Sequence, residues 1–201
     1  FVTKEQRRNG SLTVPAGLVG LSNGRRVAER ANADGTITSR WESRYPINNY
    51  LVTINVGPYV EVVEWYLGAD GALELPMTFY SLPEHLPAAR AMWRGAPAIL
   101  ASFARRFGEF PFLDDKIAVV DAPMSGMEHQ TLIAYGDDFL VDDSGIDETL
   151  VHELAHEWWG NKISAREWDD FWIQEGLATY AEVLWVEETF GAKRARDYLE
   201  R

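Results

Sequence analysis

The segment from His152 to Asn161, HELAHEWWGN, constrains what this chain can fold into more than any other stretch. His152 and His156 are four residues apart, so on an α-helix their imidazole rings lie on one face. Two neutral imidazoles placed in this way can both bind one Zn²⁺ ion at about 2.0–2.1 Å. Glu153 is rotated away from the ligand pair, which suits a carboxylate that takes a proton from metal-bound water. The segment therefore predicts a helix with two zinc ligands and a general base.

A catalytic zinc site usually has three protein ligands and one open position. Glu175, which follows His156 by 19 residues, begins the ligand face of a second predicted helix, and Glu182 falls on the same face two turns later. We expect Glu175 to be the third ligand and Glu182 to support a ligand imidazole. The alternative is that the histidines are ordinary helical residues and Glu175 a solvated charge. Two of only four histidines in the chain flank a glutamate at this spacing, which favours the zinc site.

Two stretches of the sequence resemble the M1 aminopeptidase family, the gluzincins related to aminopeptidase N and leukotriene A4 hydrolase. HELAHEWWGN followed by WIQEGLATYAE, residues 172–182, resembles the family's zinc signature. Gly126 to Thr131, GMEHQT, resembles its Gly-x-Met-Glu-Asn exopeptidase motif. His129 stands where asparagine is usual, and Gln174 replaces the commoner asparagine before the ligand glutamate. Neither change removes a metal ligand or the amine-binding carboxylate.

The resemblance implies a role for three residues of the second motif. Glu128 would bind the α-ammonium group of a peptide with a free N-terminus, and Gly126 and Met127 would line the same backbone groove. Without the motif, Glu128 would more often be an exposed strand glutamate. The resemblance also places a second amine-pocket residue upstream of Phe1 and an oxyanion-stabilising tyrosine beyond Arg201. We therefore expect a fragment that lacks both ends of the catalytic unit and turns over peptides slowly.

Composition limits the classes of partner. With 201 residues, of which 46% are hydrophobic, the chain can form two modest domains with a real core. The net charge of −12 disfavours nucleic acid, because a phosphate backbone needs a basic surface. No apolar run reaches the ~20 residues of a membrane span. The absence of cysteine excludes disulfides and a zinc–thiolate site. No targeting segment is recognised, so no compartment is predicted.

Residues 1–83 carry strand and turn signals. Two-residue turn pairs such as Asn23-Gly24 and Asp34-Gly35 separate segments rich in β-branched and aromatic residues. Strands are expected at 25–31, 36–44, 50–56, 59–67 and 73–80. We interpret this part as the end of an antiparallel, sandwich-like β-domain in which Trp41, Tyr50 and Trp65 pack in the interior.

Residues 84–201 are expected to begin a thermolysin-like zinc peptidase domain, as the resemblance implies, which makes the fold class α+β. The predicted elements are a helix at 88–107, strands at 116–121 and within 124–135, the metal helix, a helix from 169 or 170 to 190, and a further helix from 192. Ser144 would cap the metal helix, with Asp147 completing a capping box, and the helix would run to Trp159 before Gly160. Trp158 and Trp159 are expected to pack beneath the site.

The sequence thus predicts a zinc-dependent aminopeptidase with one zinc ion, acting on peptides with free N-termini. One alternative is a non-catalytic relative that binds zinc or partners without turnover, against which the presence of Glu153 argues. Another is different hydrolase chemistry at the same site, such as epoxide opening.

Overall fold

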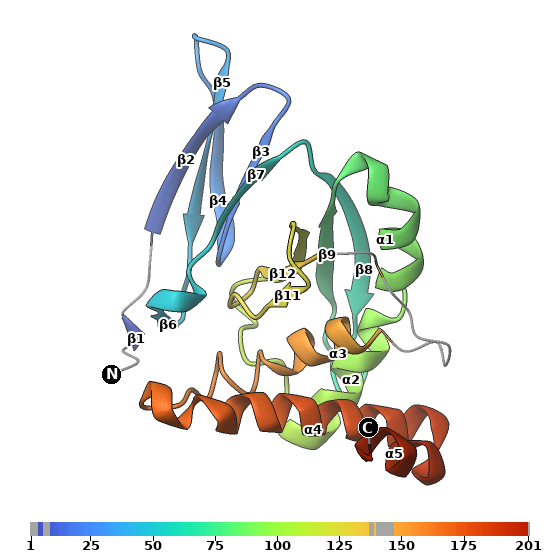
Figure 1. The fold of residues 1–201 in the computed structure, drawn as a ribbon. Helices are drawn as coiled ribbons and strands as arrows, with labels where there is room; N and C mark the ends of the chain where they lie inside the picture. The colour runs from blue at the N-terminus through green and yellow to red at the C-terminus, as the bar shows by residue number, and fades with distance from the viewer. Residues whose placement is uncertain (1–3, 6–8, 137–138, 140–146, 201) are drawn as a thin grey trace.

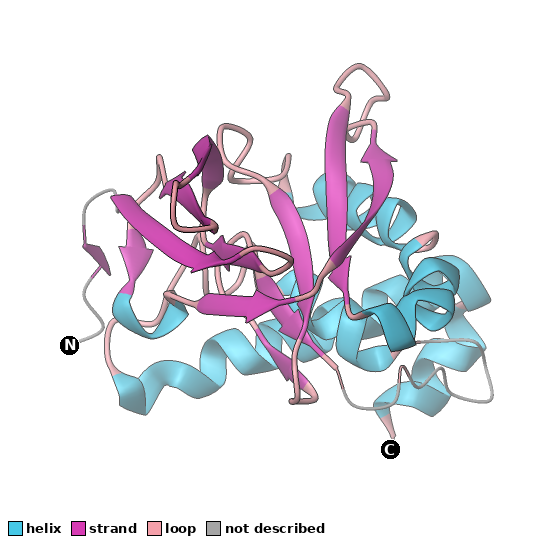
Figure 2. Ribbon diagram, turned by 90° about the horizontal axis from the view of Figure 1, so that it is seen from above, coloured by secondary structure: helices cyan, strands magenta, loops and turns pink. Residues whose placement is uncertain are grey.

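The computed structural model describes residues 4–5, 9–136, 139 and 147–200, which form three layers (Figure 1). A five-stranded mixed sheet lies in the middle, with N-terminal antiparallel strands on one face and helices on the other (Figure 2). The predicted α+β class is confirmed.

The N-terminal layer contains three small sheets, all antiparallel. Its strands are β1 (Lys4–Glu5), β2 (Asn9–Pro15), β3 (Val19–Ser22), β4 (Arg25–Ala31), β5 (Thr36–Glu42), β6 (Ile47–Asn48) and β7 (Ile54–Gly57). The predicted hairpin is present as β4 and β5. The strand predicted at 50–56 begins later, because a 3₁₀ turn, η1 (Asn49–Leu51), precedes β7.

The central sheet has the order β11-β12-β10-β9-β8. Its strands are β8 (Val60–Tyr66), β9 (Leu75–Ser81), β10 (Ile117–Asp121), β11 (Gly126–Met127) and β12 (Ile133–Tyr135). β10 runs parallel to both β9 and β12, and every residue of β10 is buried, as expected for a strand covered on both faces. Division of the chain at 83/84 stays a prediction, although the pairing of β9 with β10 crosses it.

The helices are α1 (Leu86–Trp93), α2 (Ala96–Phe107), α3 (Glu148–Ala155), α4 (Phe171–Phe190) and α5 (Ala192–Leu199), with 3₁₀ turns η2 (Pro83–His85) and η3 (Trp168–Asp170). The single helix predicted at 88–107 is wrong, since α1 and α2 replace it. Pro97 has no N–H to bond the carbonyl of Trp93, and Gly95 bonds instead to Met92 in a tighter turn. Among the described residues, no helix combines the length and apolar character needed to cross a bilayer.

Of three tryptophans predicted to pack in the interior, two are buried and one is not. Trp158 packs beneath α3 as expected, with its indole N–H donating to the Gly108 carbonyl at 2.8 Å. Trp41 is also buried, between the N-terminal layer and the central sheet. The interior position predicted for Trp65 is wrong: its side chain is 51% exposed on the edge strand β8. Val62 and Tyr66 occupy the helix-covered face of β8, so Trp65 faces the other side.

Candidate metal and amine site

Helix α3 begins at an aspartate. Asp147 accepts a hydrogen bond from the Leu150 N–H at 2.8 Å, which satisfies one of the N–H groups that a helix start leaves unpaired. The capping box predicted for Asp147 is therefore wrong, because Asp147 is itself the N-cap. Ser144, the predicted cap, lies outside the described residues.

Helix α3 ends at Ala155, four residues before the predicted end at Trp159. Beyond it the backbone first tightens, with Trp158 N bonded three residues back to Ala155 O at 3.1 Å. It then widens, with Asn161 N bonded five residues back to His156 O at 2.9 Å. His156 is the C-cap and keeps helical backbone angles (φ −61°, ψ −19°), so its ring still lies on the face that carries His152.

Three ligand atoms converge between α3 and α4. The Nε2 atoms of His152 and His156 each lie 3.4 Å from Oε2 of Glu175, and they lie 2.9 Å from one another. Ligand atoms of a tetrahedral zinc ion bound at 2.0–2.1 Å stand about 3.3–3.4 Å apart. The two histidine-to-glutamate separations match this spacing, whereas the two Nε2 atoms lie closer together. The fold therefore brings the three predicted ligands into one cluster.

The outer nitrogen of each ring is held by a hydrogen-bond acceptor. His152 Nδ1 lies 2.6 Å from Glu182 Oε1, and His156 Nδ1 lies 2.7 Å from the Trp159 carbonyl. An acceptor at Nδ1 places the single proton of a neutral imidazole there, which leaves the Nε2 lone pair of each ring for a metal ion. Glu182 in turn accepts a hydrogen bond from the Tyr198 hydroxyl of α5. This is the arrangement that orients metal-binding histidines in proteins.

The electrostatics of the cluster favour a positive charge. Burial works to lower the pKa of His152, but the carboxylates of Glu175 and Glu182 outweigh it and raise this pKa to about 10. Hydrogen bonds to the two imidazoles lower the pKa of Glu175 to about 2. Both shifts are expected where carboxylates and imidazoles lie close together, because each carboxylate stabilises a positive charge beside it. Such a cluster suits a cation.

Glu153 occupies a space that a glycine leaves open. A Cβ on Gly126 would lie 2.2 Å from Oε1 of Glu153, so no side chain fits at position 126 while the carboxylate stays in place. Oε2 of Glu153 is buried, and no described residue forms a hydrogen bond with it. Burial raises the pKa of Glu153 to about 7, which brings proton uptake and release close to neutral pH.

Glu128 faces the same space. Residues two apart on an extended strand share a face, so Glu128 lies on the side of Gly126, whereas Met127 packs with the hydrophobic cluster behind the strand. Glu128 is only 6% exposed, and its Oε1 has no hydrogen-bond partner among the described residues. Candidate ligand atoms of Glu128, Glu153 and His156 lie within 4.8 Å of one another. Burial of unpaired carboxylate oxygens in one space is costly, and a cationic group there would offset that cost.

A buried polar network of Asn161, Glu157 and Thr131 holds the backbone of Glu128. The sequence patterns did not predict this network. Asn161 donates to the Glu128 carbonyl at 2.9 Å and to Glu157 Oε2 at 3.1 Å. The other oxygen of Glu157 accepts from the Thr131 N–H at 2.8 Å. Thr131 has a positive φ of 63°, and Gly24 of the N-terminal layer donates to its hydroxyl. Asn161 is the last residue of the HELAHEWWGN segment, and this position could have indicated that it has a role at the site.

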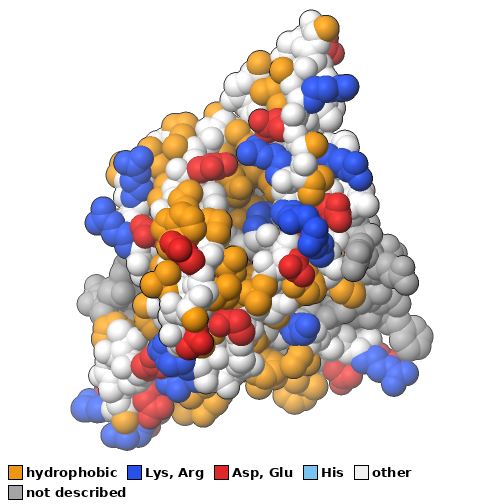
Figure 3. All heavy atoms as spheres, turned by 180° about the vertical axis from the view of Figure 1, so that it is seen from behind, with side chains coloured by type: hydrophobic (Ala, Val, Ile, Leu, Met, Phe, Trp, Pro, Cys, Tyr) orange, Lys and Arg blue, Asp and Glu red, His pale blue; other side chains and the backbone are white. Residues whose placement is uncertain are grey.

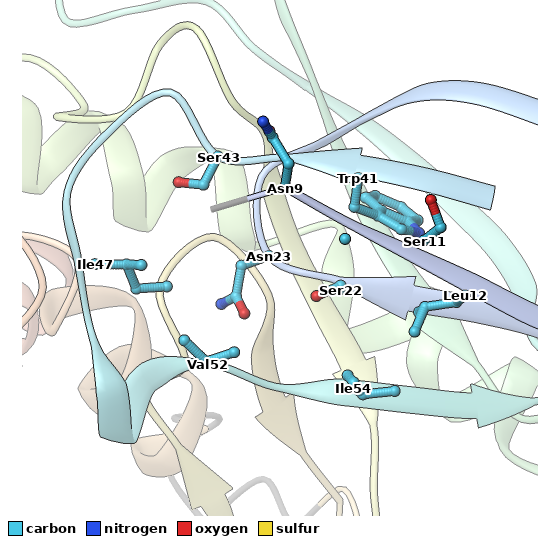
Figure 4. Close-up of a pocket in the computed structure, with 11 residues that line it drawn as sticks. Asn9, Ser11, Leu12, Ser22, Asn23, Trp41, Ser43, Ile47, Val52 and Ile54 are labelled. Carbon is cyan, nitrogen blue, oxygen red and sulfur yellow. The ribbon is translucent and has the colours of Figure 1, made fainter. Parts of the chain in front are cut away.

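Two hollows lie in different parts of the described structure, one at the candidate site and one in the N-terminal layer. A shallow one of about 240 Å³ is bordered by Gly126, His152 and Glu153, so it opens onto the candidate site. Another, of about 220 Å³, lies in the N-terminal layer beside Trp41 (Figure 4). The second belongs to the scaffold, since polar groups that line it, such as Asn23 and Ser22, bond to backbone carbonyls of the protein.

The surface carries no large field of one sign in the view from behind. Figure 3 shows acidic, basic and hydrophobic side chains intermixed over this face. Exposed arginines lie along β4 and β5, including Arg26, Arg30 and Arg40.

Comparison with known proteins shows which family this chain resembles. Residues 98–200, just over half of the chain, match the Peptidase family M1 domain. The human protein named glutamyl aminopeptidase is 28% identical over 94% of this chain and 20% of its own length. The puromycin-sensitive aminopeptidase of Caenorhabditis elegans is 28% identical over 88% of this chain and 19% of its own length. The probable aminopeptidase 1 of Saccharolobus solfataricus is 24% identical over 90% of this chain and 24% of its own length. The chain thus spans about a fifth to a quarter of these relatives.

Proposed function

Because the chain belongs to peptidase family M1, we propose that it carries the zinc site and the amine-binding site of an aminopeptidase, which removes residues from the N-termini of peptides. The observation that carries the proposal is the convergence of the His152, His156 and Glu175 ligand atoms beside two carboxylates, each of which has one buried oxygen without a partner among the described residues. The central sheet with α3 and α4 would be the start of a thermolysin-like catalytic domain.

His152, His156 and Glu175 are the residues that would hold the metal. Zinc bound there supplies a Lewis acid for the scissile carbonyl and lowers the pKa of a water molecule to about 7. The protein's part is to present the three donors in one orientation, through Glu182 on His152 and the Trp159 carbonyl on His156.

Glu153 would act as the general base. Its unpartnered Oε2 accepts a proton from the attacking water and returns it to the nitrogen of the leaving amine. Its carboxylate lies beside the ligand atom of His156 and beside Gly126, whose missing side chain leaves the space that the carboxylate occupies. A zinc-binding module without turnover would not require this carboxylate, which favours the catalytic interpretation over the scaffold.

Glu128 would select peptides with a free N-terminus. A buried carboxylate pairs with an α-ammonium group and leaves an acylated nitrogen unpaired, so blocked peptides bind poorly. The separation between this carboxylate and the ligand cluster is short enough to limit cleavage to the first peptide bond.

Glu128→Ala tests the proposal in the zinc-loaded protein. We expect it to lower kcat/KM for a free aminoacyl peptide about 10²-fold, the scale of a buried charged pair, and to change the slow cleavage of the acetylated peptide little. Glu128→Gln keeps the side-chain size and should show the same selectivity loss. An equal loss on both peptides would assign Glu128 a structural role and sink the proposed amine site.

A further inference from the structure

Tyr50 brings a hydroxyl from the N-terminal layer to the candidate site. It lies in η1, which is drawn beside β6 above the start of α4 (Figure 1). Its ring packs edge-on against Trp168 and Phe171, with ring centroids 5.2 and 5.6 Å away. The packing predicted for Tyr50 therefore describes the ring, whereas the hydroxyl reaches α4 one residue before Glu175.

The hydrogen-bond direction at this hydroxyl is set by Gln174. The amide oxygen of Gln174 accepts from the Ala165 N–H at 3.3 Å, so its NH₂ group faces Tyr50 and donates to the hydroxyl oxygen at 2.9 Å. Gln174 is 3% exposed, and no solvent competes for these bonds. Because the Tyr50 oxygen acts as the acceptor, its own proton is available to a second group.

The segment that carries Glu128 lies beside the pair formed by Tyr50 and Gln174. Asn161 holds the Glu128 carbonyl at 2.9 Å, and a Cβ on the glycine before Asn161 would lie 3.1 Å from Nε2 of Gln174. In keeping with this proximity, the Glu128 carboxylate adds to burial in raising the pKa of Tyr50. Among the described residues, Oε1 of Glu128 has no hydrogen-bond partner. A donor on one side of the carboxylate would leave Oε1 turned toward the open space shared with Glu153.

We propose that Tyr50 and Gln174 form a hydrogen-bonded pair that positions the Glu128 carboxylate for the α-ammonium group of the substrate. The inference rests on the amine-binding function proposed above for Glu128. Tyr50 is a positioning residue, since it acts through Glu128 and not on the reacting bond. Preorganisation of a charged acceptor lowers the cost of orienting it when the ligand binds, so the pair governs affinity for free amines.

The experiment compares two ligands that differ in one amino group. Zinc-loaded wild type, Tyr50→Phe, Gln174→Met and the double variant are titrated by NMR with L-leucinamide and with its des-amino analogue, 4-methylpentanamide. Tyr59→Phe is the matched control, because it also removes the hydroxyl of a half-buried tyrosine. The pKa of Tyr59 is raised by burial and by Asp121, and Glu128 is not among the causes. Glu128→Ala provides the reference for complete loss of amine recognition.

We expect Tyr50→Phe to weaken leucinamide binding about tenfold, the scale of one hydrogen bond to a charged group, and to leave the analogue's affinity unchanged. Gln174→Met should have the same effect, and the double variant should lose no more than either single one, because the two residues act as one unit. Tyr59→Phe should match wild type.

The possible outcomes distinguish failure of the positioning role of Tyr50 from failure of the amine-binding function proposed for Glu128. If Glu128→Ala abolishes the preference for the amine and Tyr50→Phe keeps it, the positioning role is wrong and the proposed function stands. If Tyr50→Phe weakens both ligands equally, its role is structural and the inference is overturned. If wild type itself shows no preference for leucinamide, the amine site proposed for Glu128 fails and the inference fails with it.

Discussion

At the scale of single residues, the position of Glu153 depends on the absence of a side chain at Gly126. The missing side chain at Gly126 leaves room for the carboxylate, and a Cβ there would lie 2.2 Å from its Oε1. We expect Gly126→Ala to displace Glu153 and to lower turnover by up to the roughly 10²–10⁴-fold that general-base catalysis contributes, at unchanged zinc content. Turnover of zinc-loaded protein is the measurement.

Gly176→Ala is the matched control for that substitution. Gly176 follows the ligand Glu175 on α4, and nothing lies within 4 Å of a Cβ at this position. We expect turnover to be retained and the helix to gain roughly 0.5–1 kcal/mol from the loss of glycine. If both alanine variants were as active as wild type, Gly126 would not confine the base.

Glu153→Gln tests the base itself. An amide of the same size keeps the packing but cannot carry the proton, so we expect zinc content to persist while turnover falls on the order of 10²–10⁴-fold. Glu187→Gln, an exposed substitution on α4, is the control and should leave turnover unchanged. Near-normal hydrolysis by zinc-loaded Glu153→Gln would identify another residue as the base.

At the scale of elements, the start of α3 depends on one aspartate. Asp147 caps the helix through Leu150 and accepts a 2.5 Å hydrogen bond from the Tyr135 hydroxyl of β12. We expect Asp147→Ala to lower the free energy of unfolding by roughly 1–3 kcal/mol, from the lost cap and an unpaired buried hydroxyl. Urea unfolding at neutral pH measures it.

Asp147→Asn separates the cap from the charge in this experiment. Asparagine is as good an N-cap as aspartate, so this variant should retain most of the stability. Identical urea midpoints for Asp147→Ala and wild type would mean that α3 is held by its packing alone.

At the scale of the whole molecule, the candidate metal site joins two helices. His152 and His156 belong to α3 and its C-cap, and Glu175 belongs to α4. A cation that binds the folded chain and not the unfolded one stabilises it, by about 2.7 kcal/mol when its concentration is 100 times Kd. We expect zinc to raise the Tm of wild type and a chelator to reverse the rise.

His156→Ala should abolish the zinc-dependent rise in Tm and most of the bound zinc, since one of three donors is gone. Metal analysis after gel filtration gives a second readout that does not depend on unfolding. Equal zinc content in the variant and in wild type would contradict the ligand assignment.

Features that follow from local periodicity were predictable from the sequence. The four-residue spacing of His152 and His156 places both rings on one face whatever the rest of the chain does, and seven residues place Glu182 below Glu175 in the same way. The β4–β5 hairpin follows from Asp34-Gly35, whose turn chemistry acts over a few residues. The family resemblance depended on these same short segments.

The remaining features come from contacts between distant parts of the chain, which no local pattern contains. Tyr50 meets Gln174 across 124 positions, and Thr131 meets Glu157 across 26. The predicted packing role of Tyr50 described its ring only, because a tyrosine ring and its hydroxyl can serve different neighbours. The early end of α3 accompanies such contacts, since Asn161 turns back to hold the Glu128 carbonyl and Glu157 accepts from the Thr131 N–H. The histidine spacing is a property of a helix, whereas the proposed amine site depends on the packing of two layers against each other.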